Sequence, residues 1–75
     1  MKSLHIHLRG IDEVKEFVNI ANNIEGDVTL SDGRHIISAK FIMGVYSLNL
    51  QKQLGLTIKE WKDEYASLFE KLATN

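Results

Sequence analysis

The sequence predicts an α+β fold in which helices cover one side of an antiparallel sheet. Two observations support this prediction. Apolar residues alternate with a period of two in four short segments, which is typical of strands with one buried face. In three other segments they recur every three or four positions, which is typical of amphipathic helices. The order along the chain is strand, helix, strand, strand, helix, strand, helix.

The first strand and the first helix are predicted from the first third of the chain. Segment 2–9 alternates, so that Leu4 and Ile6 face one way while His5 and His7 face the other. From residue 11 to residue 24 the apolar period lengthens to that of a helix. We expect Asp12 to be its N-cap, because a carboxylate can accept hydrogen bonds from the free N–H groups of the first turn.

A hairpin and a second helix follow. Segments 27–30 and 34–38 read as two strands, joined by the turn residues Ser-Asp-Gly at 31–33. Segment 40–50 then repeats its apolar residues at helical spacing and contains Gly44. Glycine disfavours a helix by up to about 1 kcal/mol, so we expect Gly44 to serve close packing against another element.

The last third of the chain predicts a strand and a final helix. Segment 54–59 alternates and reads as the fourth strand. The final helix carries one apolar stripe, which we expect to be core: Trp61, Tyr65, Leu68 and Leu72, joined by Ala66 and Phe69.

Composition excludes several kinds of protein. The 75 residues are enough for one domain, spanning 1–75, and the formal net charge of −1 argues against a nucleic-acid partner. The sequence holds no cysteine, and no apolar run approaches the length of a membrane span. It also holds no phosphate-binding glycine loop and no recognisable catalytic set. We expect a cytoplasmic protein that is not an enzyme in its own right and that binds no cofactor, metal or membrane.

The segment 41–48, Phe-Ile-Met-Gly-Val-Tyr-Ser-Leu, resembles the second-helix signature of HPr, the histidine-containing phosphocarrier of the bacterial sugar phosphotransferase system. In that family a serine precedes Ile-Met-Gly-Val, and one further residue, Ser and Leu follow. Segments 27–30 and 56–58 are similar to its second and fourth strands, and the resemblance covers roughly 17–72. It implies an HPr-like β-α-β-β-α-β-α open-faced sandwich, with sheet order 1-4-2-3 and three helices on one face.

The residues that bind and transfer phosphate in this family have no counterparts at the aligned positions of this sequence. In HPr a histidine nitrogen attacks phosphorus, and the amino end of the first helix and an arginine hold the phosphoryl group. Aligned by position, that histidine falls on Gly10 and that arginine on Asp12, which would repel a phosphoryl group. The regulatory serine falls on Phe41, which has no hydroxyl. The resemblance therefore predicts a member that lacks both phosphorylation sites.

Three function classes remain, and we favour the first. The chain is a non-catalytic binding or regulatory module; or it is a divergent phosphocarrier that uses His7 or His5; or it is a domain of this fold with an unrelated role. We expect His5 and His7 to be partly exposed strand residues. Zinc normally takes three or four protein ligands, and His35 would lie at the far edge of the sheet from them, so we expect no metal site.

The partner surface is also predicted from the resemblance. In HPr the second helix presents an apolar patch to its partners, and by position that patch is Ile42, Met43 and Tyr46, enlarged by Phe41. Val45 would turn toward the core. The expected partners are phosphotransferase-system components, a transcriptional regulator, or a second copy of the chain bound through this helix. The alternative is that Phe41 or Ile42 folds back into the small core.

Overall fold

The structure is a computed structural model that describes residues 1–70 and 72; the rest of the predicted 1–75 domain, residues 71 and 73–75, lies outside the described residues. Its elements follow the predicted order. They are β1 (Lys2–Ile6), α1 (Ile11–Asn22), β2 (Val28–Ser31), β3 (Ile36–Ser38), α2 (Ile42–Tyr46), β4 (Leu54–Ile58) and η1 (Asp63–Leu68), a 3₁₀ helix.

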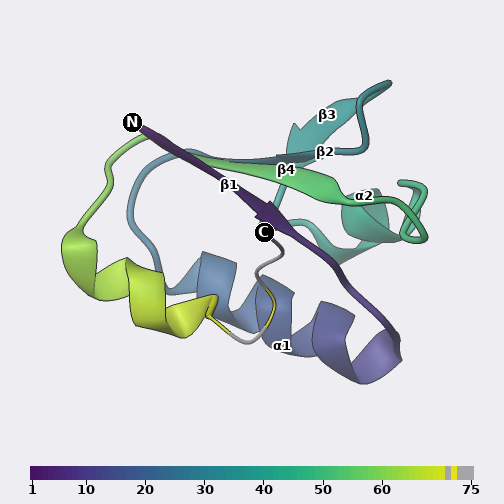
Figure 1. The fold of residues 1–75 in the computed structure, drawn as a ribbon, viewed down its shortest axis with the longest axis horizontal. Coiled ribbons are helices and arrows are strands. Elements are labelled where there is room, and N and C mark those ends of the chain that lie inside the picture. Colours follow the sequence, from purple (N-terminus) through teal and green to yellow (C-terminus); the bar gives the residue numbers. More distant parts are fainter. Residues whose placement is uncertain (71, 73–75) are drawn as a thin grey trace.

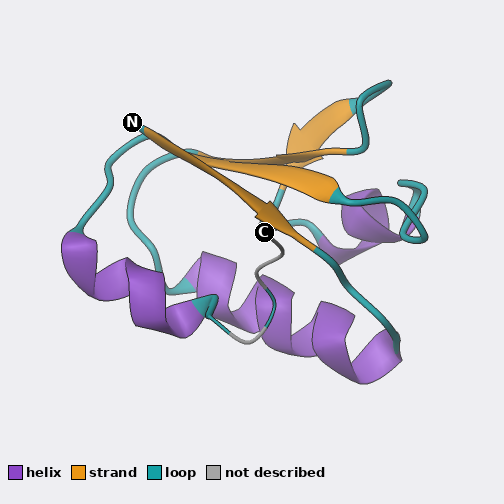
Figure 2. Cartoon of the chain, in the orientation of Figure 1, coloured by secondary structure: helices purple, strands orange, loops and turns teal. Residues whose placement is uncertain are grey.

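The four strands form one sheet in the order β1-β4-β2-β3, and each neighbouring pair is antiparallel. The three helices lie on one side of the sheet, and the other side is left open (Figure 1). The colouring by secondary structure in Figure 2 separates these two layers clearly. The predicted α+β open-faced sandwich with order 1-4-2-3 is therefore confirmed.

The core lies between the sheet and the helices. One row of apolar residues crosses all four strands, and it runs through Leu4, Leu56, Leu30 and Ile37. Against the sheet α1 packs its four buried residues: Val14, Phe17, Val18 and Ala21. Each large side chain that is fully buried in this way contributes about 1.5–3 kcal/mol.

The open face of the sheet carries a row of small polar side chains. Because side chains alternate across a strand, the row next to the apolar one points to the other side. It consists of Ser3, Thr57, Thr29 and Ser38. The hydroxyls of Ser3 and Thr57 lie 3.3 Å apart. This face therefore adds little to the core.

Both of the first two helices differ at their ends from the sequence prediction. The N-cap of α1 is Gly10 and not Asp12, which lies inside the first turn. In place of a capping side chain before the helix, Glu13 reaches back, and its Oε1 accepts the N–H of Arg9 at 2.9 Å. The helix predicted over 40–50 spans only Ile42–Tyr46. It ends there because the Asn49 N–H donates to a side chain of the β2–β3 turn and not to the helix.

The predicted final helix differs most from the structure. Tyr65 and Leu72 are buried as expected, but Leu68 is 42% exposed and Trp61 lies before η1, half-buried. Phe69, which the sequence predicts beside this stripe, is buried at 1% exposure directly after the helix ends. The cause is that η1 is a 3₁₀ helix of only six residues, so the steps of an α-helical stripe do not apply to it. None of the described helices is long and apolar enough to cross a membrane.

Candidate functional site

The short helix α2 lies between α1 and β3 and is held at both ends by side-chain hydrogen bonds to the main chain. At its beginning, Asn22 from the end of α1 donates through Nδ2 to the carbonyl of Lys40 at 3.1 Å. The same amide group donates to the carbonyl of Val18 at 2.9 Å, which fixes its orientation. The residue before α2 is therefore tied to the end of α1.

The other end of α2 is held by Asp32, a role that the sequence did not predict. Its Oδ1 accepts the N–H groups of Arg34 at 2.9 Å and His35 at 3.0 Å within the hairpin turn. Its Oδ2 accepts the N–H of Asn49 at 3.0 Å, three residues after the helix ends. The three amides, that of Asn49 foremost, hold the pKa of this carboxyl well below its usual value. An aspartate before a glycine signals a turn, but nothing in the sequence points to Asn49.

Three of the four predicted binding residues are exposed on or beside α2. Phe41 is 60% exposed, Met43 64% and Tyr46 38%. Ile42 is half-buried and packs against the core, while Val45 is fully buried. In the following we call Phe41, Met43 and Tyr46 the α2 patch. The sequence left open whether Phe41 or Ile42 folds back into the core. Ile42 does so in part, and Phe41 does not.

Gly44 lies under the ring of Phe41. A Cβ atom at this position would be 3.1 Å from Phe41 Cδ2 and 3.6 Å from Ile37 Cβ. The first distance is tighter than ordinary van der Waals contact, so a side chain here would displace the ring. The glycine therefore lets α2 approach β3 closely and lets the Phe41 ring lie against its backbone, as the sequence predicted for close packing.

A groove of about 420 Å³ adjoins the α2 patch at the amino end of α1. It is lined by residues of both helices and of the loop after α2, among them Gly10, Ile11, Val14, Tyr46 and Leu50. Ile11, on the first turn of α1, is 62% exposed at its rim. Tyr46 belongs both to the groove and to the α2 patch, so the two form one continuous surface.

The groove includes Gly10 and adjoins Asp12, the two residues that the sequence resemblance aligns with the phosphoryl site of HPr. Gly10 has no side chain, and the carboxylate of Asp12 is exposed in the first turn of α1. His7 lines the groove beside Arg9, and the main-chain N–H of His7 donates to the carbonyl of Leu72 at 2.9 Å. The arrangement is that of an apolar depression with one histidine at its edge.

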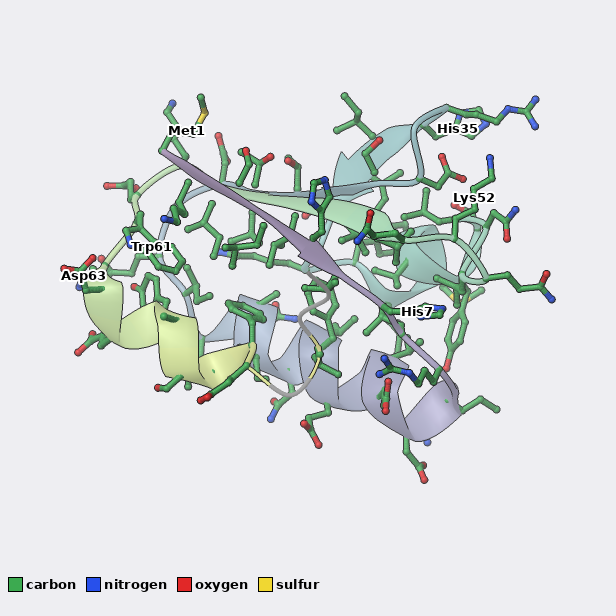
Figure 3. The ribbon with its side chains drawn as sticks, viewed as in Figure 1. Met1, His7, His35, Lys52, Trp61 and Asp63 are labelled. Carbon is green, nitrogen blue, oxygen red and sulfur yellow. The ribbon has the colours of Figure 1, made fainter. Side chains whose placement is uncertain are left out.

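His35 lies apart from His5 and His7 in the fold. Figure 3 shows His7 close to the amino end of α1 and His35 at the hairpin turn beside β3. His5 is exposed and lies on the open face of the sheet. Within residues 1–70 and 72, no three His, Cys, Asp or Glu side chains gather in a way that could hold a metal ion.

The fold is similar to that of a solved HPr. The crystal structure of HPr-C-His from Thermoanaerobacter tengcongensis matches with a TM-score of 0.78 and 21% sequence identity, over 97% of this chain and 91% of that chain. At this identity the likeness shows the fold, which is HPr-like. No family model matches the sequence, and no curated protein matches it.

Proposed function

We propose that this chain is an HPr-like protein-binding or regulatory module that does not carry phosphate. The observation that carries the proposal is the α2 patch. A 75-residue protein needs its apolar residues for the core, yet here Phe41 and Met43 are each 60% exposed or more. Aromatic residues and methionine are enriched at the centres of protein interfaces. The patch also lies where the resembled family docks its partners.

The residues at the two phosphorylation positions support the absence of phosphoryl transfer. Gly10 offers no nucleophile, and Asp12 places a negative charge where HPr has an arginine. Phe41 occupies the position of the regulatory serine and has no hydroxyl to accept a phosphate. With both chemistries removed, binding is the activity that the site can support. Phosphotransferase-system components and transcriptional regulators are the two partner classes that the resemblance offers.

The binding role is tested with a double variant of the α2 patch. Met43→Ala with Tyr46→Ala should leave the circular dichroism spectrum unchanged, because both side chains are exposed. It should weaken binding to the partner that co-purifies with the tagged chain from its own cells. Leu68→Ala is the matched control, since Leu68 is also exposed, at 42%, but belongs to η1. If the double variant binds as well as the parent, the patch is not the interface.

One observation favours a second candidate, the divergent phosphocarrier. His7 lines the groove at the beginning of α1 beside Arg9, near the place where HPr has its phosphorylated histidine. Incubation with phosphoenolpyruvate and the first enzyme of the phosphotransferase system separates the two proposals, with HPr as the positive control. We expect no phosphohistidine. An acid-labile phosphate that forms at the rate of HPr and is lost in His7→Ala, but not in His5→Ala, would establish the second candidate instead.

A further inference from the structure

The sheet has two edge strands, β1 and β3, and they differ in how well they are protected (Figure 1). Proteins usually blunt an exposed edge with charged side chains, with proline or with a covering segment. β1 begins with Lys2, and the main-chain N–H of His7 just after it donates to the carbonyl of Leu72 at 2.9 Å, so another segment of the chain lies at that edge. β3 holds no charged residue and no proline, and none of the described strands pairs with its outer side.

The free main-chain groups of β3 belong to Ile36 and Ser38. In an antiparallel pair these groups point alternately toward the partner strand and away from it. The N–H of Ala39 donates to the carbonyl of Val28 at 2.8 Å, so the groups of Ile36 and Ser38 point away from β2. The carbonyl of Ser38 accepts the N–H of Phe41 at 3.2 Å. Among the described residues, the N–H and carbonyl of Ile36 and the N–H of Ser38 are left without a partner.

The side chain of Ile36 adds an apolar contact to this edge. It is 74% exposed, more than any other large apolar side chain of the described residues except Met1. A residue paired with Ile36 on the outer side would place its own side chain beside that of Ile36, on the same face of the sheet. The next residue of such a strand would point to the other face, where Ile37 and Ser47 line part of a depression beside β3.

Positive charge is exposed at the beginning of β3. Arg34 and His35 line the depression there. The neighbouring Asp32 is 8% exposed, and its carboxylate accepts hydrogen bonds from three main-chain amides. At the end of β3 a second depression is lined by one cation, Lys40, and one anion, Asp27, which offset each other. An anionic group beside β3 is therefore favoured at the beginning of the strand and not at its end.

We propose that β3 binds an extended segment of a protein partner as an added strand, with an apolar residue beside Ile36 and acidic residues beside Arg34 and His35. In this mode main-chain hydrogen bonds supply affinity and the side-chain positions select the sequence. A second copy of the chain fits less well. In the antiparallel register that uses both Ile36 and Ser38, Arg34 of one copy would face Lys40 of the other, and like charges placed opposite one another are destabilising. The inference concerns a surface other than the α2 patch and does not depend on it.

The test titrates the whole ¹⁵N-labelled chain with short peptides of alternating valine and threonine. The probe peptide ends in two glutamates, because antiparallel pairing brings its carboxyl end to the beginning of β3. We expect it to shift the amide resonances of Ile36 and Ser38 and to slow their hydrogen exchange. A control peptide carries an N-methyl group on its central valine, which removes the N–H that would donate to the Ile36 carbonyl. It should bind about tenfold more weakly. A second control has lysines in place of the glutamates and should bind about threefold more weakly, a difference that salt removes.

Variants of the chain locate the binding at β3. Ile36→Thr keeps a strand-forming residue at an exposed position, so it should fold normally and lose about fivefold in affinity with the apolar contact. Ile11→Thr is the matched control, because Ile11 is 62% exposed but lies on α1, and it should bind as the parent does. Arg34→Ala should abolish the preference for the glutamate peptide over the lysine peptide. The double variant of Met43 and Tyr46 should bind the peptide as the parent does, because the α2 patch takes no part.

Several results would overturn the inference. They are no shifted resonance with any peptide, equal binding of the N-methyl peptide, or unchanged affinity in Ile36→Thr. A dimer in sedimentation that Ile36→Thr dissociates would place a second copy at β3. Loss of peptide binding in the double variant of Met43 and Tyr46 would place the peptide on the α2 patch. If the double variant keeps the cellular partner while Ile36→Thr loses the peptide, the proposed function fails and the inference at β3 stands.

Discussion

Phe69 should matter more for stability than Trp61, although the sequence pattern favours the tryptophan as the core residue. Phe69 is 1% exposed, and its ring centroid lies 6.0 Å from that of Phe17, which is fully buried. Phe69→Ala should therefore cost about 3–5 kcal/mol. A domain of this length has a total stability of about 4–11 kcal/mol, so the variant would lose about a quarter of it or more.

The expected loss for Trp61→Ala is smaller because its side chain is only half-buried. The ring centroids of Trp61 and Tyr65 lie 5.9 Å apart with the rings nearly perpendicular, and the ammonium of Lys2 lies 5.7 Å from the centroid of Trp61. An aromatic pair contributes about 0.5–1.5 kcal/mol and an exposed cation–π contact about 0.5–1 kcal/mol. Together with partial burial, we expect a loss of about 1–3 kcal/mol.

Urea denaturation followed by far-ultraviolet circular dichroism measures both variants with one signal. This signal is needed because Trp61 is the only tryptophan of the chain and its removal abolishes the intrinsic fluorescence probe. Equal slopes of the free energy of unfolding against urea would show that the variants are compared between the same two states. A larger loss in Trp61→Ala than in Phe69→Ala would refute the account of the C-terminal packing.

Two further predictions concern the residues that position α2. Asp32→Asn should lower the melting temperature at neutral pH. Because the pKa of the Asp32 carboxyl is lowered in the folded state, its contribution to the free energy of unfolding is present above its usual pKa of 3.8 and is lost progressively as the pH falls below that value. Melts at different pH should therefore show the difference in melting temperature between variant and parent narrowing below this pH. Gly44→Leu should cost about 1–3 kcal/mol in urea denaturation, because the side chain would meet Ile37. Gly44→Ala should cost less, because the exposed Phe41 ring can move away.

The sheet could be predicted from the sequence because its burial follows a strict period of two. Leu54, Leu56 and Ile58 of β4 are all fully buried, and the two residues between them are only partly buried. Such a strand has one register that keeps its apolar side inward, since a slip by one residue would turn that side to water. The order of the strands came from the resemblance to HPr and not from this pattern.

The ends of the helices could not be predicted because tertiary hydrogen bonds set them. The helical pattern of 40–50 continues past Tyr46, but the N–H of Asn49 is used by Asp32, 17 residues earlier. Likewise Trp61 and Leu68 have the right spacing for an α-helical stripe, but the 3₁₀ geometry of η1 turns Leu68 outward. The spacing of apolar residues along the chain indicates neither the hydrogen bond from Asn49 to Asp32 nor the 3₁₀ geometry of η1.

The candidate site was only partly accessible from the sequence. The pattern gave the residues of α2 but not which of its apolar side chains are exposed, since Phe41 and Ile42 are adjacent and both apolar. The structure separates them, with Phe41 60% exposed and Ile42 packed against the core. The groove was missed altogether, because it joins residues 7–14 to residues 46–51 and no local signal links the two segments.

The architecture of α2 lets the α2 patch change without loss of the fold. Gly44 and Val45 of the helix are buried, and Leu48 just after it is 5% exposed, so these three residues supply its attachment to the core. The side chains of the α2 patch are exposed, and the hydrogen bonds that hold the helix come from Asn22 and Asp32, outside the patch. Substitutions in the patch therefore act on exposed side chains, whose removal costs little stability. The proposed partner surface can therefore take on a new specificity while the sandwich beneath it stays the same.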